Sequence, residues 1–291
     1  MTYSELFLNP EPNVSYRVEG KKPISKVFGV PYDATSSFKP GSRFGPNALR
    51  EAFMKIEVYD PGLDVDADKL PVEDLGNLQM TSTPQEMVDA VSKVTEEIVS
   101  DGYVPGVIGG EHTLTFGTFS AMPPNTHILV FDAHFDLRAN LYGWELGHGT
   151  FLRRLSERIG YDKVIHVGGR SASREEWRLV KSEKLKTIFS KDIGKSKYLD
   201  EFRYLMTIPT KVYVSVDLDI LDPAYMPGTG TPEPGGITSK ELFSMLEILK
   251  GKEIVGFDVV ELNPMVDPYG ISSATAAKVF SLLLSLVSLM K

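Results

Sequence analysis

The chain has 291 residues, enough for one large α/β domain or two small ones, and its 42% hydrophobic and 24% charged residues are ordinary for a globular protein. A net charge of −8 argues against binding to nucleic acid. Because the sequence has no cysteine, disulfides, thiolate metal sites and a cysteine nucleophile are excluded, and any bound metal must have nitrogen and oxygen ligands.

Both ends of the sequence predict a protein without a membrane segment. Residues 1–20 are polar and lack the apolar core of a signal peptide, so we expect a cytoplasmic protein. The most apolar stretch, residues 279–290, is shorter than the roughly 20 residues that span a membrane, and it contains Ser281, Ser285 and Ser288. This stretch is therefore predicted to be a terminal helix packed in the core.

Six short apolar runs rich in β-branched residues recur along the chain. They are continuous rather than alternating, which is typical of strands buried on both faces of a parallel sheet. These predicted strands span residues 27–30, 104–108, 128–131, 164–167, 212–216 and 254–260.

Helical patterns lie between these strands. Thr83 begins a capping box with Pro84 at the first helical position, and apolar residues follow at helical spacing. Thr238 begins a second capping box, and Gly251 suits the C′ position of the helix that follows. Strands and helices alternate over the whole length without a repeat or a linker, which predicts one three-layer α/β domain over residues 1–291.

Acidic and imidazole side chains follow four of the predicted strands. Asp132, Asp217 and Glu261 each follow the end of one strand, and the run Gly-Gly-Glu-His at 109–112 follows another. In an open parallel sheet, ligands bind beyond the carboxyl ends of the strands. Four strands therefore deliver acids or imidazoles to one edge, and this convergence is a stronger indication of a site than any single motif.

Six side chains near this edge are candidate metal ligands, some of them at alternate positions that share a face of an extended chain. An aspartate at a strand end is more often a cap or turn residue, and a lone histidine is usually structural. The convergence of these side chains at one edge favours metal ligands over cap, turn or structural roles, because clustered buried carboxylates without a cation would repel one another. The six candidates are His112, Asp132, His134, Asp136, Asp217 and Asp219.

Charge counting indicates two metal ions at this site. The four aspartates carry four negative charges, which two divalent cations would cancel. Carboxylate and imidazole ligands without thiolate suit manganese, and zinc and iron also accept such ligands. Two ions about 3.5–4 Å apart can share a water molecule and lower its pKa from about 16 toward 7, which predicts a hydrolase.

Several stretches together resemble the ureohydrolase family, which includes the arginases and agmatinases. The closest likeness is to agmatinases, on the wording Gly-Thr-Pro-Glu-Pro-Gly-Gly at 230–236 and Asp-Leu-Arg at 136–138. Glu111 stands where many members have aspartate, at a position that is not a ligand. The matching stretches, which extend from about Gly29 to the end, are residues 29–33, 41–46, 109–112, 132–136, 215–223, 228–236 and 258–264.

The resemblance implies an arginase-like α/β/α fold with a doubly wound, mostly parallel sheet and a site for two Mn²⁺ ions. It implies that Asp136, His148 and Glu261 take part in catalysis, with His148 as a mobile proton-transfer residue. Glu261, Thr231 and His148 are expected to contact the substrate. One ion would have His112, Asp132, Asp136 and Asp217 as ligands, and the other would have His134, Asp132, Asp217 and Asp219.

The function implied by the resemblance is hydrolysis of agmatine to putrescine and urea, a step of polyamine biosynthesis. Alternatives within the family are 4-guanidinobutanoate, formiminoglutamate or arginine as the substrate. A catalytically inactive metal-binding protein and a metal-dependent deacetylase on a related fold are further alternatives. The expected partner is a small cationic guanidino compound, without nucleic acid or membrane, and family members are commonly homo-oligomers, trimers or hexamers.

The loop at residues 137–147 is expected to set the substrate. It lacks the serine that arginases place there for the α-carboxylate of arginine, and its Leu141, Tyr142 and Trp144 could pack on a methylene chain while Glu145 attracts a terminal cation. Arg138 could instead bind a carboxylate. Four further residues are interpreted as structural: His127, His166 and, as ion-pair residues, Arg43 and Arg170.

Overall fold

The computed structural model describes residues 3, 7–9, 14 and 21–290. Within these residues the centre is a nine-stranded sheet in which eight strands run parallel and β1, at one edge, is antiparallel to β5. From one edge to the other the strands are β1 (Leu8–Asn9), β5 (Val72–Leu78), β2 (Ser25–Val30), β6 (Val104–Gly109), β11 (Glu253–Val260), β10 (Lys211–Asp217), β7 (His127–Phe131), β8 (Val164–Val167) and β9 (Lys186–Ile188).

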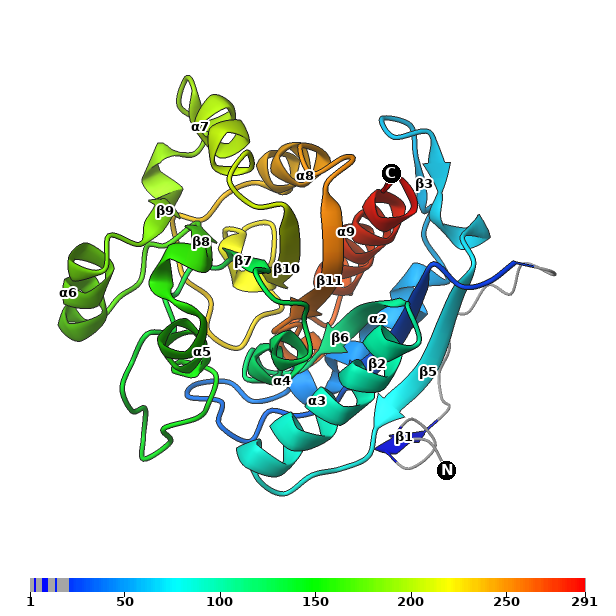
Figure 1. Ribbon diagram of the computed structural model, residues 1–291, viewed down its shortest axis with the longest axis horizontal. Coiled ribbons are helices and arrows are strands. Elements are labelled where there is room, and N and C mark those ends of the chain that lie inside the picture. Colours follow the sequence, from blue (N-terminus) through cyan, green and yellow to red (C-terminus); the bar gives the residue numbers. More distant parts are fainter. Residues whose placement is uncertain (1–2, 4–6, 10–13, 15–20, 291) are drawn as a thin grey trace.

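Helices cover both faces of this sheet, and all six strands predicted from the sequence are present (Figure 1). The predicted three-layer α/β/α architecture is therefore confirmed. One face carries α2 (Gly45–Phe53), α7 (Tyr198–Leu205), α8 (Ser239–Glu247) and α9 (Ile271–Ser288), and the other carries α3 (Pro84–Ser100), α4 (Leu114–Ser120), α5 (Phe151–Ile159) and α6 (Arg174–Ser182). A short antiparallel pair, β3 (Tyr59–Asp60) and β4 (Val65–Asp66), lies apart from the sheet.

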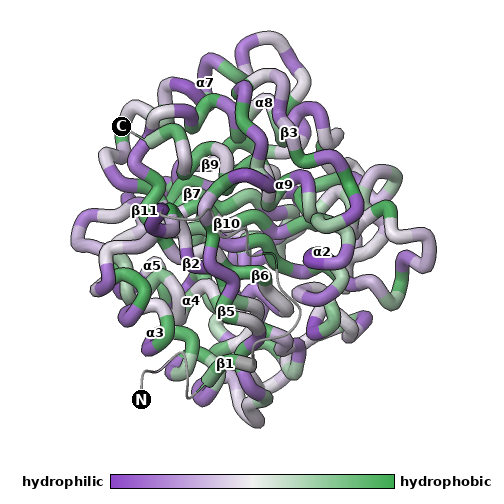
Figure 2. The backbone as a smooth tube through the Cα atoms, turned by 90° about the vertical axis from the view of Figure 1, so that its right-hand side faces the viewer, coloured by the Kyte–Doolittle hydropathy of each residue, from purple (hydrophilic) through white to green (hydrophobic). Residues whose placement is uncertain are grey.

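The hydrophobic core fills the two spaces between the sheet and its helices. On one side the rings of Phe257 in β11 and Phe280 in α9 pack 5.6 Å apart. On the other side Val91 of α3 and Leu155 of α5 are fully buried. The central strands are mostly hydrophobic, and the more hydrophilic segments lie toward the outside of the molecule (Figure 2).

The two predicted capping boxes are confirmed. In α3 the Thr83 side chain accepts a hydrogen bond from the amide of Glu86, whose carboxylate accepts one from the amide of Thr83. Thr238 and Glu241 make the same pair of bonds at the start of α8. The prediction for Gly251 is wrong, because α8 ends at Glu247 and Gly251 lies in the turn before β11, where its φ of 79° favours glycine.

The predicted terminal helix is α9, which begins eight residues before the apolar stretch at residues 279–290. It is the one helix of the described residues that is long and apolar enough to cross a membrane, but 67% of its 18 residues, Ile271–Ser288, are buried within the protein. Fully buried side chains such as Ala276, Phe280 and Leu283 lie among residues of α2, α8 and β11. Its apolar composition is therefore that of a core helix.

Candidate metal centre

The four strands that carry the candidate ligands and Glu261 are neighbours in the centre of the sheet. Their order is β6, β11, β10 and β7, and all three pairings between them are parallel. Each polar run begins at or just after the carboxyl end of its strand, so the runs meet at one edge, as predicted. Because these strands are buried on both faces, the edge is held rigidly by the core.

The structure brings the six candidate ligands together. The Nδ1 atom of His112 lies 3.2 Å from a carboxylate oxygen of Asp132, 3.2 Å from one of Asp217 and 3.5 Å from one of Asp136. The Nδ1 atom of His134 lies 2.9 Å from Asp219 and 3.7 Å from Asp132. Two groups could each hold an ion, and they share Asp132: His112, Asp132 and Asp136, and Asp132, His134 and Asp219.

Local hydrogen bonds fold the two aspartate runs toward this centre. Asp132 accepts a bond from the amide of His134 at 2.6 Å, and Asp217 accepts one from the amide of Asp219 at 2.8 Å. Such bonds from an aspartate to the amide two residues on are typical of tight turns. Asp136 has a positive φ of 50°, which aspartate tolerates and which turns its side chain to the same site. Alternate residues can therefore all face one point.

Hydrogen bonds behind His112 place a proton on its Nε2 atom. The buried carboxylate of Asp258 accepts bonds from the hydroxyls of Ser215, Tyr213 and Thr115 at 2.6, 2.6 and 2.8 Å. Because Ser215 gives its proton to Asp258, it must accept the 2.8 Å bond from Nε2 of His112. The Nδ1 atom of His112, which has no hydrogen-bond partner among the described residues, then faces the carboxylates.

This arrangement requires positive charge between the ligands. One Asp132 oxygen is also buried, and no residue of the described part of the chain forms a hydrogen bond with it. Burial and the neighbouring aspartates raise the pKa of Asp217 and of Asp136 well above the usual range. Burial lowers the pKa of His112, but Asp132 and Asp217 outweigh it and raise that pKa. Protonating both histidines would leave the four aspartates only half neutralised, whereas two divalent ions would balance them, so the donor set fits two metal ions.

Glu261, Thr231 and His148 lie beside this cluster, as expected. Glu261 has a positive φ of 64°, and its carboxylate accepts a 2.8 Å bond from the amide of His112. Burial and the nearby Glu111 raise the pKa of Glu261 to about 8. Thr231 donates to Asp219 at 3.3 Å. Burial lowers the pKa of the half-buried His148 to about 4, so its imidazole is neutral at neutral pH.

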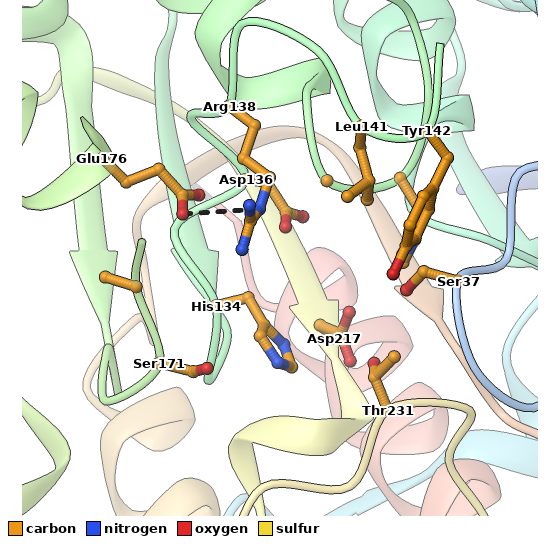
Figure 3. A pocket seen from close by; sticks show the side chains of 13 residues that line it. Ser37, His134, Asp136, Arg138, Leu141, Tyr142, Ser171, Glu176, Asp217 and Thr231 are labelled. Atoms are coloured by element: carbon orange, nitrogen blue, oxygen red, sulfur yellow. Dashed lines mark ion pairs between the residues drawn. The ribbon is translucent and has the colours of Figure 1, made fainter. Parts of the chain in front are cut away.

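A cavity of about 210 Å³ opens above the cluster (Figure 3). His134, Asp217 and Thr231 lie at its inner end, and Leu141 and Tyr142 lie opposite Arg138 across its outer part. Residues 137–149 supply much of its wall, including His148. The remaining lining residues are Ser37, Asp136, Gly149, Ser171, Ala172 and Glu176.

Known proteins are similar to this chain in sequence and in fold. The sequence pattern of the arginase family matches residues 25–285. An agmatinase of Bacillus subtilis (strain 168) is 35% identical over 274 residues, covering 91% of this chain and 92% of its own. An N(1)-aminopropylagmatine ureohydrolase of Thermococcus kodakarensis is 34% identical, covering 88% and 89%. The structure of agmatine ureohydrolase of Thermoplasma volcanium matches with a TM-score of 0.86 at 33% identity, covering 91% of this chain and 90% of that one.

The chain belongs to the arginase family. It is therefore a hydrolase that acts on guanidino substrates, and its buried histidine and aspartate cluster is compatible with the binuclear metal centre of that family. The arginase-like fold expected from the sequence is confirmed by the same comparisons.

The residues expected around the substrate differ in whether they line the cavity. Trp144 and Glu145 do not line the cavity, and Trp144 is 41% exposed on the surface. Arg138 does line it, and its Nε atom lies 3.6 Å from the buried carboxylate of Glu176. Glu261 does not line the cavity either, since it lies behind His112.

Two arginines that we interpreted as ion-pair residues differ in what they contact. Arg43 does pair with Asp33, at 2.5 Å from its Nε. Arg170 pairs with no carboxylate in the described part of the chain, and instead donates to backbone carbonyls, including that of Asp219 at 2.7 Å. Arg170 is therefore structural, as interpreted, but it holds the turn that contains Asp219 through carbonyl groups and not through an ion pair.

The histidines are held in place by residues whose contacts are not evident from the sequence. Asp258 lies inside the apolar run of β11, where a single acid in a buried strand is itself a signal that a polar partner lies nearby. His166, interpreted as structural, donates from Nε2 to the carbonyl of His134 at 2.7 Å and stacks on Phe135. These contacts belong to this arginase-family site as supports of His112 and His134.

Proposed function

We propose that the protein is an agmatinase, which hydrolyses agmatine to putrescine and urea and uses two Mn²⁺ ions. The observation that carries this proposal is the outer wall of the cavity. Arg138 is the basic residue of that wall, and the buried carboxylate of Glu176 offsets its charge. A substrate carboxylate would compete with Glu176 for Arg138, whereas the uncharged methylene chain of agmatine can lie along Leu141 and Tyr142.

The six clustered side chains are proposed to hold the two ions. One would have His112 and Asp136 as ligands and the other His134 and Asp219, with Asp132 and Asp217 shared. When bound, the ions would lower the pKa of a water molecule and so supply a nucleophile at neutral pH. The chain itself contributes the ligand geometry and the surrounding negative charge, which attracts a guanidinium.

The acid–base work is proposed for His148. Its imidazole is neutral at neutral pH and lines the cavity, and its buried Nε2 atom has no hydrogen-bond partner in the described chain. A neutral imidazole can take a proton as the attack proceeds and give it to the departing amine. Thr231 lines the inner end of the cavity, where its hydroxyl can orient the guanidinium, and Glu261, behind His112, is proposed to attract the guanidinium.

The test is a comparison of kcat/KM for agmatine, arginine and 4-guanidinobutanoate with manganese present. Leaving a substrate carboxylate poorly matched costs about 1–3 kcal/mol, so agmatine should be preferred by roughly ten- to a hundredfold. Equal or better turnover of either carboxylate-bearing compound would show that the substrate is wrong and leave the hydrolase assignment in place. N(1)-aminopropylagmatine belongs in the same assay, because one relative is named for that substrate.

A further inference from the structure

Two loops form the mouth of the cavity, and one hydroxyl joins them. The loop between β2 and α2 contributes Ser37 to the cavity wall, and the loop between β7 and α5 contributes Leu141, Tyr142 and His148. The side-chain oxygen of Thr35, in the first loop, lies 3.0 Å from the amide nitrogen of His148 in the second. Because an amide can only donate, Thr35 is the acceptor in this bond.

The proton of the Thr35 hydroxyl therefore goes to another group, and Glu111 is placed to receive it. The hydroxyl donates to one oxygen of Glu111 at 2.6 Å, and the amide of Thr35 donates to the other oxygen at 2.7 Å. The hydroxyl of Thr113 donates to the first oxygen as well. All three residues are at most 5% exposed. The chain of bonds thus has one direction, from His148 through Thr35 to Glu111.

Glu111 is a rigid base for this chain of bonds. It follows β6 directly and precedes His112, and its amide donates to the carbonyl of Tyr32 at 2.7 Å. At Gly110 a Cβ atom would lie 2.1 Å from that same carbonyl oxygen, so only glycine allows the segment after β6 to approach Tyr32 this closely. The carboxylate of Glu111 is therefore fixed relative to the metal-binding edge of the sheet.

His148 depends on its backbone for its position. Its side chain makes no hydrogen bond to any described residue, and its Nε2 atom is buried without a partner. A side chain that moves protons must be placed accurately, because a misplacement of about 1 Å can cost on the order of a hundredfold in rate. The bond from the His148 amide to Thr35 is the direct link between this residue and the sheet edge.

We infer that Thr35 and Glu111 are positioning residues, which hold the amide of His148, and hence its imidazole, at a fixed place above the metal-binding edge. This inference rests on the proposed proton transfer by His148. It gives a role to the glutamate of the Gly-Gly-Glu-His run, which is not among the clustered ligands.

The test compares Thr35→Val and Glu111→Gln with Thr35→Ser and a control, Thr95→Val. Valine keeps the shape of threonine without the hydroxyl, and glutamine turns an NH₂ group toward the hydroxyl or the amide of Thr35, which both donate to Glu111. Serine restores the hydroxyl. Thr95 is buried in α3 and donates only to the carbonyl of Val91, far from the site in sequence and fold.

We expect Thr35→Val and Glu111→Gln to lower kcat about 10- to 100-fold with little change in KM and in bound manganese. Thr35→Ser should recover most of the loss, and Thr95→Val should match the unmodified protein. Unchanged kcat in both Thr35→Val and Glu111→Gln would overturn the inference. So would lost manganese in those variants, because it would mean that they disturb the ligands and not His148.

A second substrate separates positioning of the proton donor from general damage. In S-(4-aminobutyl)isothiourea the carbon–sulfur bond breaks instead of the carbon–nitrogen bond. The thiol can leave as its anion, so urea and a thiolate form without a proton from the enzyme. Thr35→Val should then lose at most about threefold, because the proton donor no longer limits the rate. An equal loss on both substrates would overturn the inference.

Hydrogen exchange keeps the test independent of the proposed substrate. In Thr35→Val the amides of residues 147–149 should exchange faster than in the unmodified protein, while those of β6 and β7 remain unchanged. If the unmodified protein does not hydrolyse agmatine but this exchange difference appears, the substrate assignment fails and the link between the loops stands. If no difference appears, Thr35 does not hold the His148 loop, whatever the substrate.

Discussion

The floor and the mouth of the site are built differently. On the floor, Asp132, Asp217 and His112 follow central strands and are held by turns and by the buried Asp258 network. At the mouth, Tyr142 is 80% exposed, and the loop that carries it is held by separate side-chain bonds, such as those from Arg154 to the carbonyls of Ala139 and Glu145, and not by strand pairing. In the proposed function, the floor would determine which reaction is possible, and the mouth would determine where the proton donor and the substrate tail lie.

This difference predicts that changes to the floor alter bound metal, whereas changes to the mouth alter turnover with the metal in place. The largest effect is expected for Asp217→Asn, because Asp217 lies 3.2 Å from His112 and its turn holds Asp219. Activity should be abolished and manganese content should fall well below two ions per chain, measured by elemental analysis. The exposed Asp200 of α7 provides the control Asp200→Asn, which should change neither.

Two ions bound to Asp217→Asn at unchanged affinity would contradict the shared-ligand assignment. Chelation of the unmodified protein extends the same test. Removing the ions should abolish activity and lower the melting temperature, because the clustered carboxylates then repel one another. Readdition of manganese should restore both, and a protein that remains active after complete metal removal would contradict the metal-centre proposal.

The next largest effect is expected at the mouth, for His148→Asn. Loss of a general acid–base group costs about 10²–10⁴-fold in kcat, and manganese content should be unchanged because His148 is not one of the six clustered ligands. The control is His127→Asn, at the beginning of β7 and away from the cavity. Turnover of His148→Asn that equals the unmodified protein at every pH would show that His148 is only a loop residue.

The same contrast explains what the sequence could predict. The strands of the floor were found because they are continuous apolar runs, and their acids meet because β6, β11, β10 and β7 are neighbours. β5 was missed because it lies next to the edge strand and alternates between buried and half-buried residues. At the mouth, the sequence could not predict whether Trp144 and Glu145 face the substrate, since no periodicity fixes the direction of a loop side chain, and neither of them lines the cavity.

Asp258 supports the floor only indirectly, through Ser215, and its substitution has the smallest predicted effect. Among the described residues it forms no hydrogen bond with the six candidate ligands, yet its carboxylate takes the Ser215 proton and so makes Ser215 accept from Nε2 of His112. In Asp258→Asn the amide can donate to Ser215, whose proton can then turn to His112 and favour the tautomer with a proton on Nδ1. Outer-shell changes of this kind weaken metal binding about 10- to 100-fold.

The measurement is the manganese concentration that half-restores activity in the metal-free protein. For Asp258→Asn this concentration should rise about 10- to 100-fold, and saturating manganese should recover most of kcat, because the reacting groups are intact. Ser285→Ala is the matched control, since it also removes a buried polar group, from α9, that bonds only within its own helix. A low kcat that persists at saturating manganese would mean that Asp258 acts on the chemistry itself. A substitution in the floor would then alter turnover with the metal in place, which contradicts the predicted difference between floor and mouth.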